Sequence, residues 1–149
     1  MPSQSATRGV RHAAAPYPEL VLLVLGVWSM LPPYIGPALG LELNVAAKVE
    51  VVDHVVAGAV VALCAALAAL LVRRARRAGL GASGFALALA LTGLCFLGGL
   101  WQVATHVPLV AEGGSPQAPW GTVLLHSTPG VPIVALALWL TLRSTLDQE

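Results

Sequence analysis

The side chains best suited to chemistry lie where polar groups adjoin long apolar stretches. Glu50, Asp53 and His54 stand together at the start of one such stretch. Glu50 and His54 are four residues apart, so they share one face of a helix. Gln102 and His106 form a second pair with the same spacing at the end of another stretch. Ionisable groups inside a membrane are costly and usually face a bundle interior or a wet cavity, so a functional site is the first hypothesis.

A third histidine, His126, follows the start of the last apolar stretch. In a helix beginning at Trp120 it lies roughly 9 Å deep, and His54 lies about 7 Å below a boundary at Val49. Three imidazoles and two acids are therefore expected in one leaflet of a membrane. Imidazole with carboxylate suits zinc, copper, iron or nickel. The expected metal ligands are His54, His126, His106, Asp53 and Glu50.

Three other interpretations of this cluster stay open. His54 and His126, at matching depth, could hold the iron of haem b from both faces. The cluster could also be a hydrated polar cap that binds nothing. The third interpretation is a path for protons or a solute, which would need polar groups across the whole membrane. The sequence argues against such a path, because the halves of the second, third and fourth apolar stretches away from the cluster are almost wholly alanine, leucine and valine.

The sequence after His126 predicts a broken helix. Pro129 and Pro132, with Gly130 between them, remove backbone donors and disturb the preceding turns. Broken helices in transporters use such freed carbonyls to bind ions, although neighbouring hydroxyls can also satisfy them locally. The residues expected to line a cavity here are Gln102, Ser127, Thr128 and Pro129.

Composition predicts an all-α membrane protein. Of the 149 residues, 57% are hydrophobic and 10% are charged, against roughly 25% charged in soluble domains. Uncharged apolar runs predict a four-helix transmembrane bundle with spans at about 19–39, 49–72, 83–106 and 120–142, flanked by tails at 1–18 and 143–149. The first and fourth helices are expected to kink at prolines. We expect the first apolar run to be retained as a helix rather than cleaved as a signal peptide.

Basic residues predict the orientation. Arg8, Arg11 and Arg143 fall on the same side of a four-span protein as the arginine-rich turn, so both termini are expected to be cytoplasmic. That turn could also hold anionic lipid headgroups; it contains Arg73, Arg74, Arg76 and Arg77. Richness in Ala, Leu, Gly, Val and Arg favours a bacterial cytoplasmic membrane.

Small residues at four-residue spacing predict close helix packing. Gly58 begins one such row in span 49–72 and Gly84 begins another in span 83–106. A hairpin of these two spans is the expected kernel, and the same rows could join two copies of the chain. Cys64 and Cys95 lie mid-span and are expected to pack as small hydrophobes.

Several function classes are disfavoured. A net charge of +1 gives no case for nucleic acid. The chain has no HExxH, CxxC or CxxCH pattern, no nucleophile elbow and no glycine-rich phosphate loop, so we do not expect an enzyme. The sequence favours a small membrane protein that binds a cation, transition metal or haem, as an accessory subunit of a larger membrane complex. A small transporter or proton conductor, and a structural subunit without ligand, are the alternatives.

Overall fold

The computed structural model of the chain describes residues 17–43, 46–78 and 81–146. Within these ranges every element is a helix, and the only bridge of β type joins Ser115 to Ala118. In chain order the elements are α1 (Tyr17–Ser29), α2 (Pro32–Leu39), α3 (Ala47–Glu50), the π-helix η1 (Val51–Val56), α4 (Ala57–Ala78), α5 (Ala82–Ala111), α6 (Trp120–Ser127) and α7 (Gly130–Leu146).

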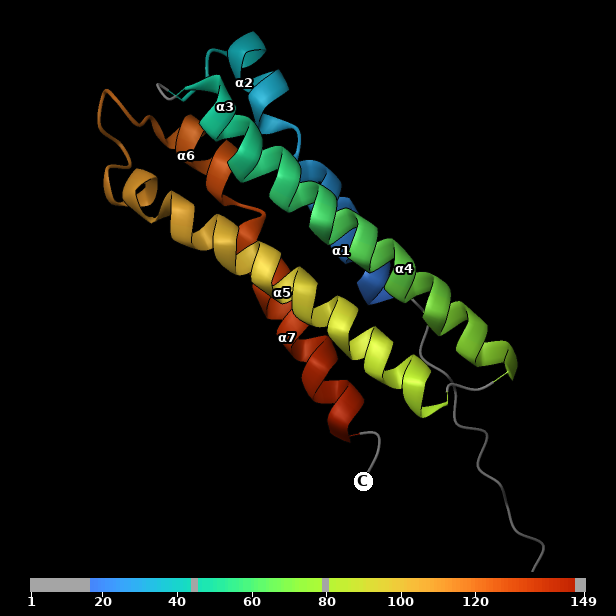
Figure 1. Cartoon of the computed structure of the whole chain (residues 1–149). Helices are drawn as coiled ribbons and strands as arrows, with labels where there is room; N and C mark the ends of the chain where they lie inside the picture. The colour runs from blue at the N-terminus through green and yellow to red at the C-terminus, as the bar shows by residue number, and fades with distance from the viewer. Residues whose placement is uncertain (1–16, 44–45, 79–80, 147–149) are drawn as a thin grey trace, which may run out of the picture.

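The long helices α1, α4, α5 and α7 lie side by side, and the short helices α2, α3 and α6 gather at one end of them (Figure 1). Helices α3, η1 and α4 follow one another without a gap, so they form one continuous rod from Ala47 to Ala78. The end of α4, the start of α5 and the end of α7 lie at the opposite end of the bundle (Figure 1). The molecule therefore has two distinct ends, which carry different side chains.

Three of the helical segments are long and apolar enough to cross a membrane: Lys48–Ala75, Ala82–Ala111 and Trp120–Leu146. Helices α1 and α2 pass the same test together but bend by 54° between Ser29 and Pro32. Consecutive prolines at the start of α2 explain the bend, because a proline cannot continue the hydrogen-bond ladder of the preceding helix. The all-helical fold is thus confirmed, with three helices that could span a membrane and a fourth candidate only if the bent pair counts as one span.

The ends of the helices differ from the expected spans. Helix α5 continues to Ala111 and contains Pro108, beyond the end of the span expected at about residue 106. Proline leaves one carbonyl of the preceding turn without its partner, but the helix continues until the Glu112 amide bonds to the Pro108 carbonyl. The predicted N-terminal tail lies outside the described residues up to position 16, and α1 begins at Tyr17.

The closest helix crossing joins α1 to α4. A methyl carbon built at Gly26 would lie 2.6 Å from the backbone nitrogen of Ala62, and one built at Gly58 would lie 2.7 Å from the Gly26 carbonyl oxygen. The small-residue row that starts at Gly58 therefore packs against α1. Helix α1 thus belongs to the central packing unit together with the expected pair α4 and α5. Small residues allow this approach because they hold no side chain between the backbones.

The apolar core fills the middle of the bundle. Its most buried members come from α1, α4, α5 and α7, and they include Leu22, Val61, Ala65, Cys95, Ile133 and Ala137. Cys64 and Cys95 are both buried and unpaired, which confirms that they pack as small side chains. The polar residues of interest therefore lie beyond this core, at the end formed by α2, α3 and α6.

Candidate functional site

The three histidines expected to meet do so. His54 comes from η1, His106 from the last turns of α5 and His126 from α6. The ring centres of His54 and His106 are 4.8 Å apart, and those of His54 and His126 are 5.1 Å apart. Their exposed fractions are 1%, 5% and 1%, respectively. The structure thus places three imidazoles from separate helices in one buried cluster.

The π-helix η1 carries two of the expected site residues. In a π-turn the backbone bonds span five residues, which widens the turn, and such turns occur often at functional sites. Within η1, Val51 and Val52 are exposed, Asp53 is half-buried and His54 is fully buried. The amphipathic spacing in the sequence predicted a regular helix here, and no residue type in this segment signals the wider turn.

Backbone carbonyls fix the orientation of two histidine rings. The Nδ1 atom of His106 lies 2.8 Å from the Gln102 carbonyl oxygen, and that of His126 lies 2.9 Å from the Thr122 carbonyl oxygen. A carbonyl can only accept, so each Nδ1–H donates and each Nε2 keeps a lone pair when the ring is neutral. Metal-ligating histidines are commonly held in this way, with the second ring nitrogen on a backbone carbonyl.

The free Nε2 atoms point at other members of the cluster. The Nε2 atoms of His106 and His54 are 3.2 Å apart, and His126 Nε2 is 3.3 Å from Glu50 Oε1. The first contact is an ordinary hydrogen bond when neutral His54 carries its proton on Nε2 and donates to the His106 lone pair. The second contact sets a lone pair of His126 against a carboxylate, so it requires a shared proton or a cation. Glu50 is 9% exposed, so its carboxylate meets His126 with little water around it.

Two further polar groups border the cluster. The Nδ1 atom of His54 makes no hydrogen bond within the described residues. Gln102 is buried, and its Oε1 lies 3.1 Å from the hydroxyl oxygen of Ser29. Ser29 also lies 2.8 Å from the Leu25 carbonyl oxygen. The sequence interpretation missed Ser29, although a polar residue just before the prolines of an apolar helix was the available signal.

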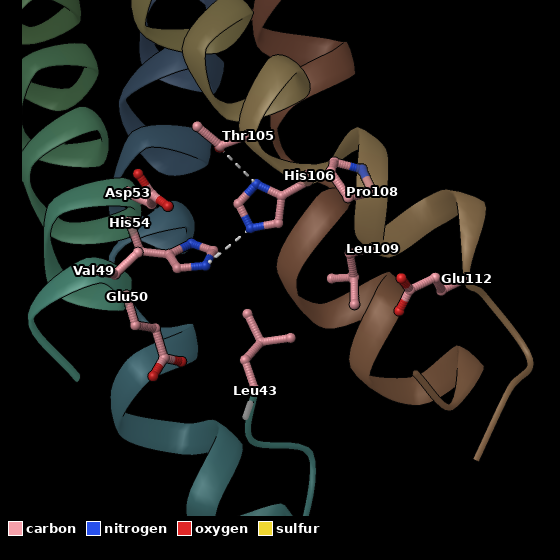
Figure 2. A pocket seen from close by; sticks show the side chains of 10 residues that line it. All are labelled: Leu43, Val49, Glu50, Asp53, His54, Thr105, His106, Pro108, Leu109 and Glu112. Atoms are coloured by element: carbon pink, nitrogen blue, oxygen red, sulfur yellow. Dashed lines mark hydrogen bonds between the residues drawn. The ribbon is translucent and has the colours of Figure 1, made fainter. Parts of the chain in front are cut away.

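A cavity of about 220 Å³ opens beside His54 and His106 (Figure 2). Its walls come from the start of the α3–η1–α4 rod, the end of α5 and the segment before α3. The residues that line it are Leu43, Val49, Glu50, Asp53, His54, Thr105, His106, Pro108, Leu109 and Glu112. Thr105 lies within hydrogen-bond reach of the His106 ring, at 3.0 Å from Nδ1. The expected pocket therefore exists on the α5 side of the cluster.

The four residues expected to line a cavity after the helix break have different surroundings. Ser127 lines a second, mostly apolar cavity of about 370 Å³ between α5 and α7, which His106 also borders. The Thr128 side chain is exposed, and its hydroxyl donates to the Leu124 carbonyl. Pro129 is buried. The Thr128 hydroxyl thus satisfies a carbonyl near the helix break locally, as one of the two alternatives predicted. The Gln102 side chain packs toward Ser29 instead.

The arginine-rich segment lies at the other end of the bundle. Arg73, Arg74 and Arg77 are exposed at the end of α4, far along the rod from η1 (Figure 1). Arg76 belongs to the same helical turn. The acids and imidazoles of the cluster are thus separated from this basic end by the apolar core.

Among residues 17–43, 46–78 and 81–146, no group of three or more His, Cys, Asp or Glu side chains forms a ready-made metal site. The four closest donor atoms instead form two pairs, His54 with His106 and His126 with Glu50. No known protein family, curated protein or solved structure matches this chain. The function must therefore be argued from the cluster itself.

Proposed function

We propose that the protein binds a divalent transition-metal ion of the zinc class through His54, His106, His126 and Glu50. The observation that carries this proposal is the contact of three buried imidazoles, two of which have Nδ1 bonded to a carbonyl and Nε2 directed at another member of the cluster. Imidazole nitrogens with one carboxylate oxygen are a donor set that suits zinc, copper or nickel.

The separations support this donor set. A tetrahedral zinc ion with metal–nitrogen bonds of about 2.0 Å sets neighbouring donor atoms about 3.3 Å apart and the centres of their imidazole rings about 5 Å apart. The two donor pairs are 3.2 and 3.3 Å apart, and the ring centres are 4.8 and 5.1 Å apart. Completing the site requires side-chain rotations that bring the two pairs onto one ion. Asp53, half-buried beside them, is the spare carboxylate.

Haem b fits this arrangement less well. An iron held between two imidazoles by bonds of about 2.0 Å would place the ring centres about 6 Å apart. The rings of His54 and His126 are closer than that, at 5.1 Å, and they meet edge to face. A single ion is therefore the better occupant.

A proton-carrying role is the second candidate, and the contact of His126 with Glu50 favours it. Because Nδ1 of His126 donates to a carbonyl, the 3.3 Å contact between Nε2 and Oε1 requires one shared proton when no metal is bound. A through-path is disfavoured, because Val61, Ala65 and Ile133 fill the core below the cluster. This candidate predicts proton exchange at one face only.

We infer a four-span topology with both termini cytoplasmic in a bacterial inner membrane, and with the cluster toward the outside. The exposed arginines at the end of α4 support this orientation through the positive-inside rule. A C-terminal green fluorescent protein fusion is expected to fluoresce, and a C-terminal alkaline phosphatase fusion is expected to be inactive. An active phosphatase fusion would reverse the orientation. Assembly as a homo-oligomer, or as an accessory subunit of a larger membrane complex, belongs to the same proposal.

Metal analysis of the detergent-purified full chain tests the main proposal. The wild-type protein is expected to hold stoichiometric zinc or copper, and cobalt loading should give the visible bands of a tetrahedral ion. His54→Ala and His126→Ala should lose both signals. His12→Ala, which removes the one histidine outside the cluster, should retain them.

Folding controls keep the test decisive. His126→Gln retains a polar side chain of similar size, so helicity by circular dichroism should persist while cobalt binding is lost. A Soret band in the purified protein would select haem instead. A colourless, metal-free protein under metal-replete conditions would favour the structural subunit without ligand.

A further inference from the structure

We propose that the cavity beside His54 and His106 is the access route by which the metal ion enters and leaves the site, and that Asp53 and Glu112 are positioning carboxylates that capture the ion first. This inference rests on the proposed metal-binding function. It adds that the ion is exchangeable and that it arrives from the face of the membrane at the end formed by α2, α3 and α6.

The first support is the connection between buried imidazoles and the surface. His54 and His106 are almost fully buried, yet both line a cavity of about 220 Å³ whose wall also contains the exposed Glu112 (Figure 2). Asp53, half-buried, lines the same cavity from η1, on the opposite side from Glu112 (Figure 2). Acidic groups thus border the opening on two sides. A permanently enclosed structural ion would need no such opening.

The second support is an unsatisfied nitrogen on the ring of His54, a residue that lines the cavity. His54 is 1% exposed, and its Nδ1 makes no hydrogen bond within the described ranges. A buried polar atom without a partner is costly and calls for an explanation, such as a bound ion or water. His54 lines the cavity, so the ring that carries this unpaired nitrogen lies beside the proposed route.

The third support is the charge of the wall. Three of the lining residues are carboxylic acids, namely Glu50, Asp53 and Glu112, and none is lysine or arginine. A cleft lined by one sign of charge, with low-dielectric walls, concentrates counter-ions and speeds their association. Leu43 and Leu109 supply apolar wall here. The cavity is therefore selective for cations over anions.

The position of Glu112 gives a fourth support. It caps the C-terminus of α5, and the continuation of that helix past Pro108 brings it to the rim of the cavity. The C-terminal end of a helix is the negative end of its dipole, so an acid there is electrostatically unfavourable. A cation passing through the cavity would relieve this repulsion.

The two roles of the acids can be separated by kinetics. Glu50 contacts His126 and belongs to the proposed ligand set, so its loss should weaken the bound state. Asp53 and Glu112 act on the approaching ion, so their loss should mainly slow association. Because this attraction acts over a Debye length of about 8 Å at physiological salt, it should weaken as salt is added.

The test follows cobalt binding to the full chain by stopped-flow absorbance in nanodiscs of zwitterionic lipid. The double variant Asp53→Asn with Glu112→Gln is expected to associate about tenfold more slowly than wild type, with a flatter salt dependence and an unchanged dissociation rate. Glu42→Gln is the matched control, because Glu42 is an exposed acid at the same end that does not line the cavity.

The outcomes distinguish the two proposals. If wild type binds cobalt and the double variant associates equally fast, or if Glu42→Gln slows association by the same factor, the access route is wrong while the metal site stands. If wild type binds no cobalt, the proposed function fails and this inference fails with it. The single variants Asp53→Asn and Glu112→Gln are each expected to slow association about threefold and to leave dissociation unchanged.

Discussion

The crossing of α1 and α4 gives the sharpest prediction about how the fold supports the site. In Gly26→Ala the new methyl carbon would lie 2.6 Å from the backbone nitrogen of Ala62 and 3.0 Å from the Gly58 carbonyl oxygen. Carbon atoms normally pack at about 3.5–4.0 Å. Both neighbours are backbone, so neither can rotate away. The two helices must separate by about 1 Å over this turn.

The change in the free energy of unfolding of Gly26→Ala follows from two opposing effects. Overpacking of this kind costs about 1–3 kcal/mol, and alanine recovers about 1 kcal/mol relative to glycine within a helix. We expect the free energy of unfolding to fall by about 2 kcal/mol, since a backbone clash lies at the upper end of the range. The metal site should also weaken, because Ser29 follows one turn later and contacts Gln102 beneath His106.

Gly93→Ala is the matched control. Nothing lies within 4 Å of the methyl carbon that it would add to α5, so only the gain in helix propensity remains, about 1 kcal/mol at most. Reversible unfolding in mixed micelles of dodecyl maltoside and sodium dodecyl sulfate, followed by circular dichroism, measures both variants. A Gly26→Ala protein as stable as wild type, or a Gly93→Ala protein equally weakened, would refute the close crossing.

Two further predictions concern the site and the core. Glu50→Gln should lower cobalt affinity at least about tenfold, because a neutral amide replaces a charged ligand, although the amide NH₂ can donate to His126 Nε2; an unchanged affinity in a cobalt titration would remove Glu50 from the ligand set. Ile133→Ala should cost about 2–5 kcal/mol of unfolding free energy because its side chain is fully buried in the core. Leu138→Ala, on the exposed face of α7, should cost about 0.5 kcal/mol or less, and equal losses in the micelle assay would contradict this packing.

Much of this arrangement is predictable from the sequence because membrane solvation is a strong constraint. Apolar runs long enough to cross a bilayer gave the helices, and consecutive prolines at Pro32 gave the bend after α1. Counting residues along each helix also placed His54, His106 and His126 at one level. Depth along a helix depends only on the rise per residue, so it transfers from sequence to structure.

What lies beside each residue was harder to predict. Gly58 belongs to a row that could face either neighbour of α4, and nothing in its spacing identifies α1. Ser127 and Thr128 adjoin His126 in sequence, yet one lines a different cavity and the other is exposed. Glu112 lies beyond the span expected to end at about residue 106, because a proline such as Pro108 normally ends a helix. Rotation about a helix axis depends on tertiary packing, which a single sequence does not encode locally.

The π-turn of η1 makes the geometry of the cluster depend on chain length in one place. A π-turn holds one residue more than the α-turn that would replace it. Removing Val52 would let an α-turn replace the π-turn, and Glu50 and His54, then three residues apart, would point about 60° away from each other around the rod. The carboxylate would then lose His126, although every polar residue of the cluster would remain in the sequence. Deletion of this one apolar residue should therefore abolish metal binding by the cluster as completely as the loss of a histidine.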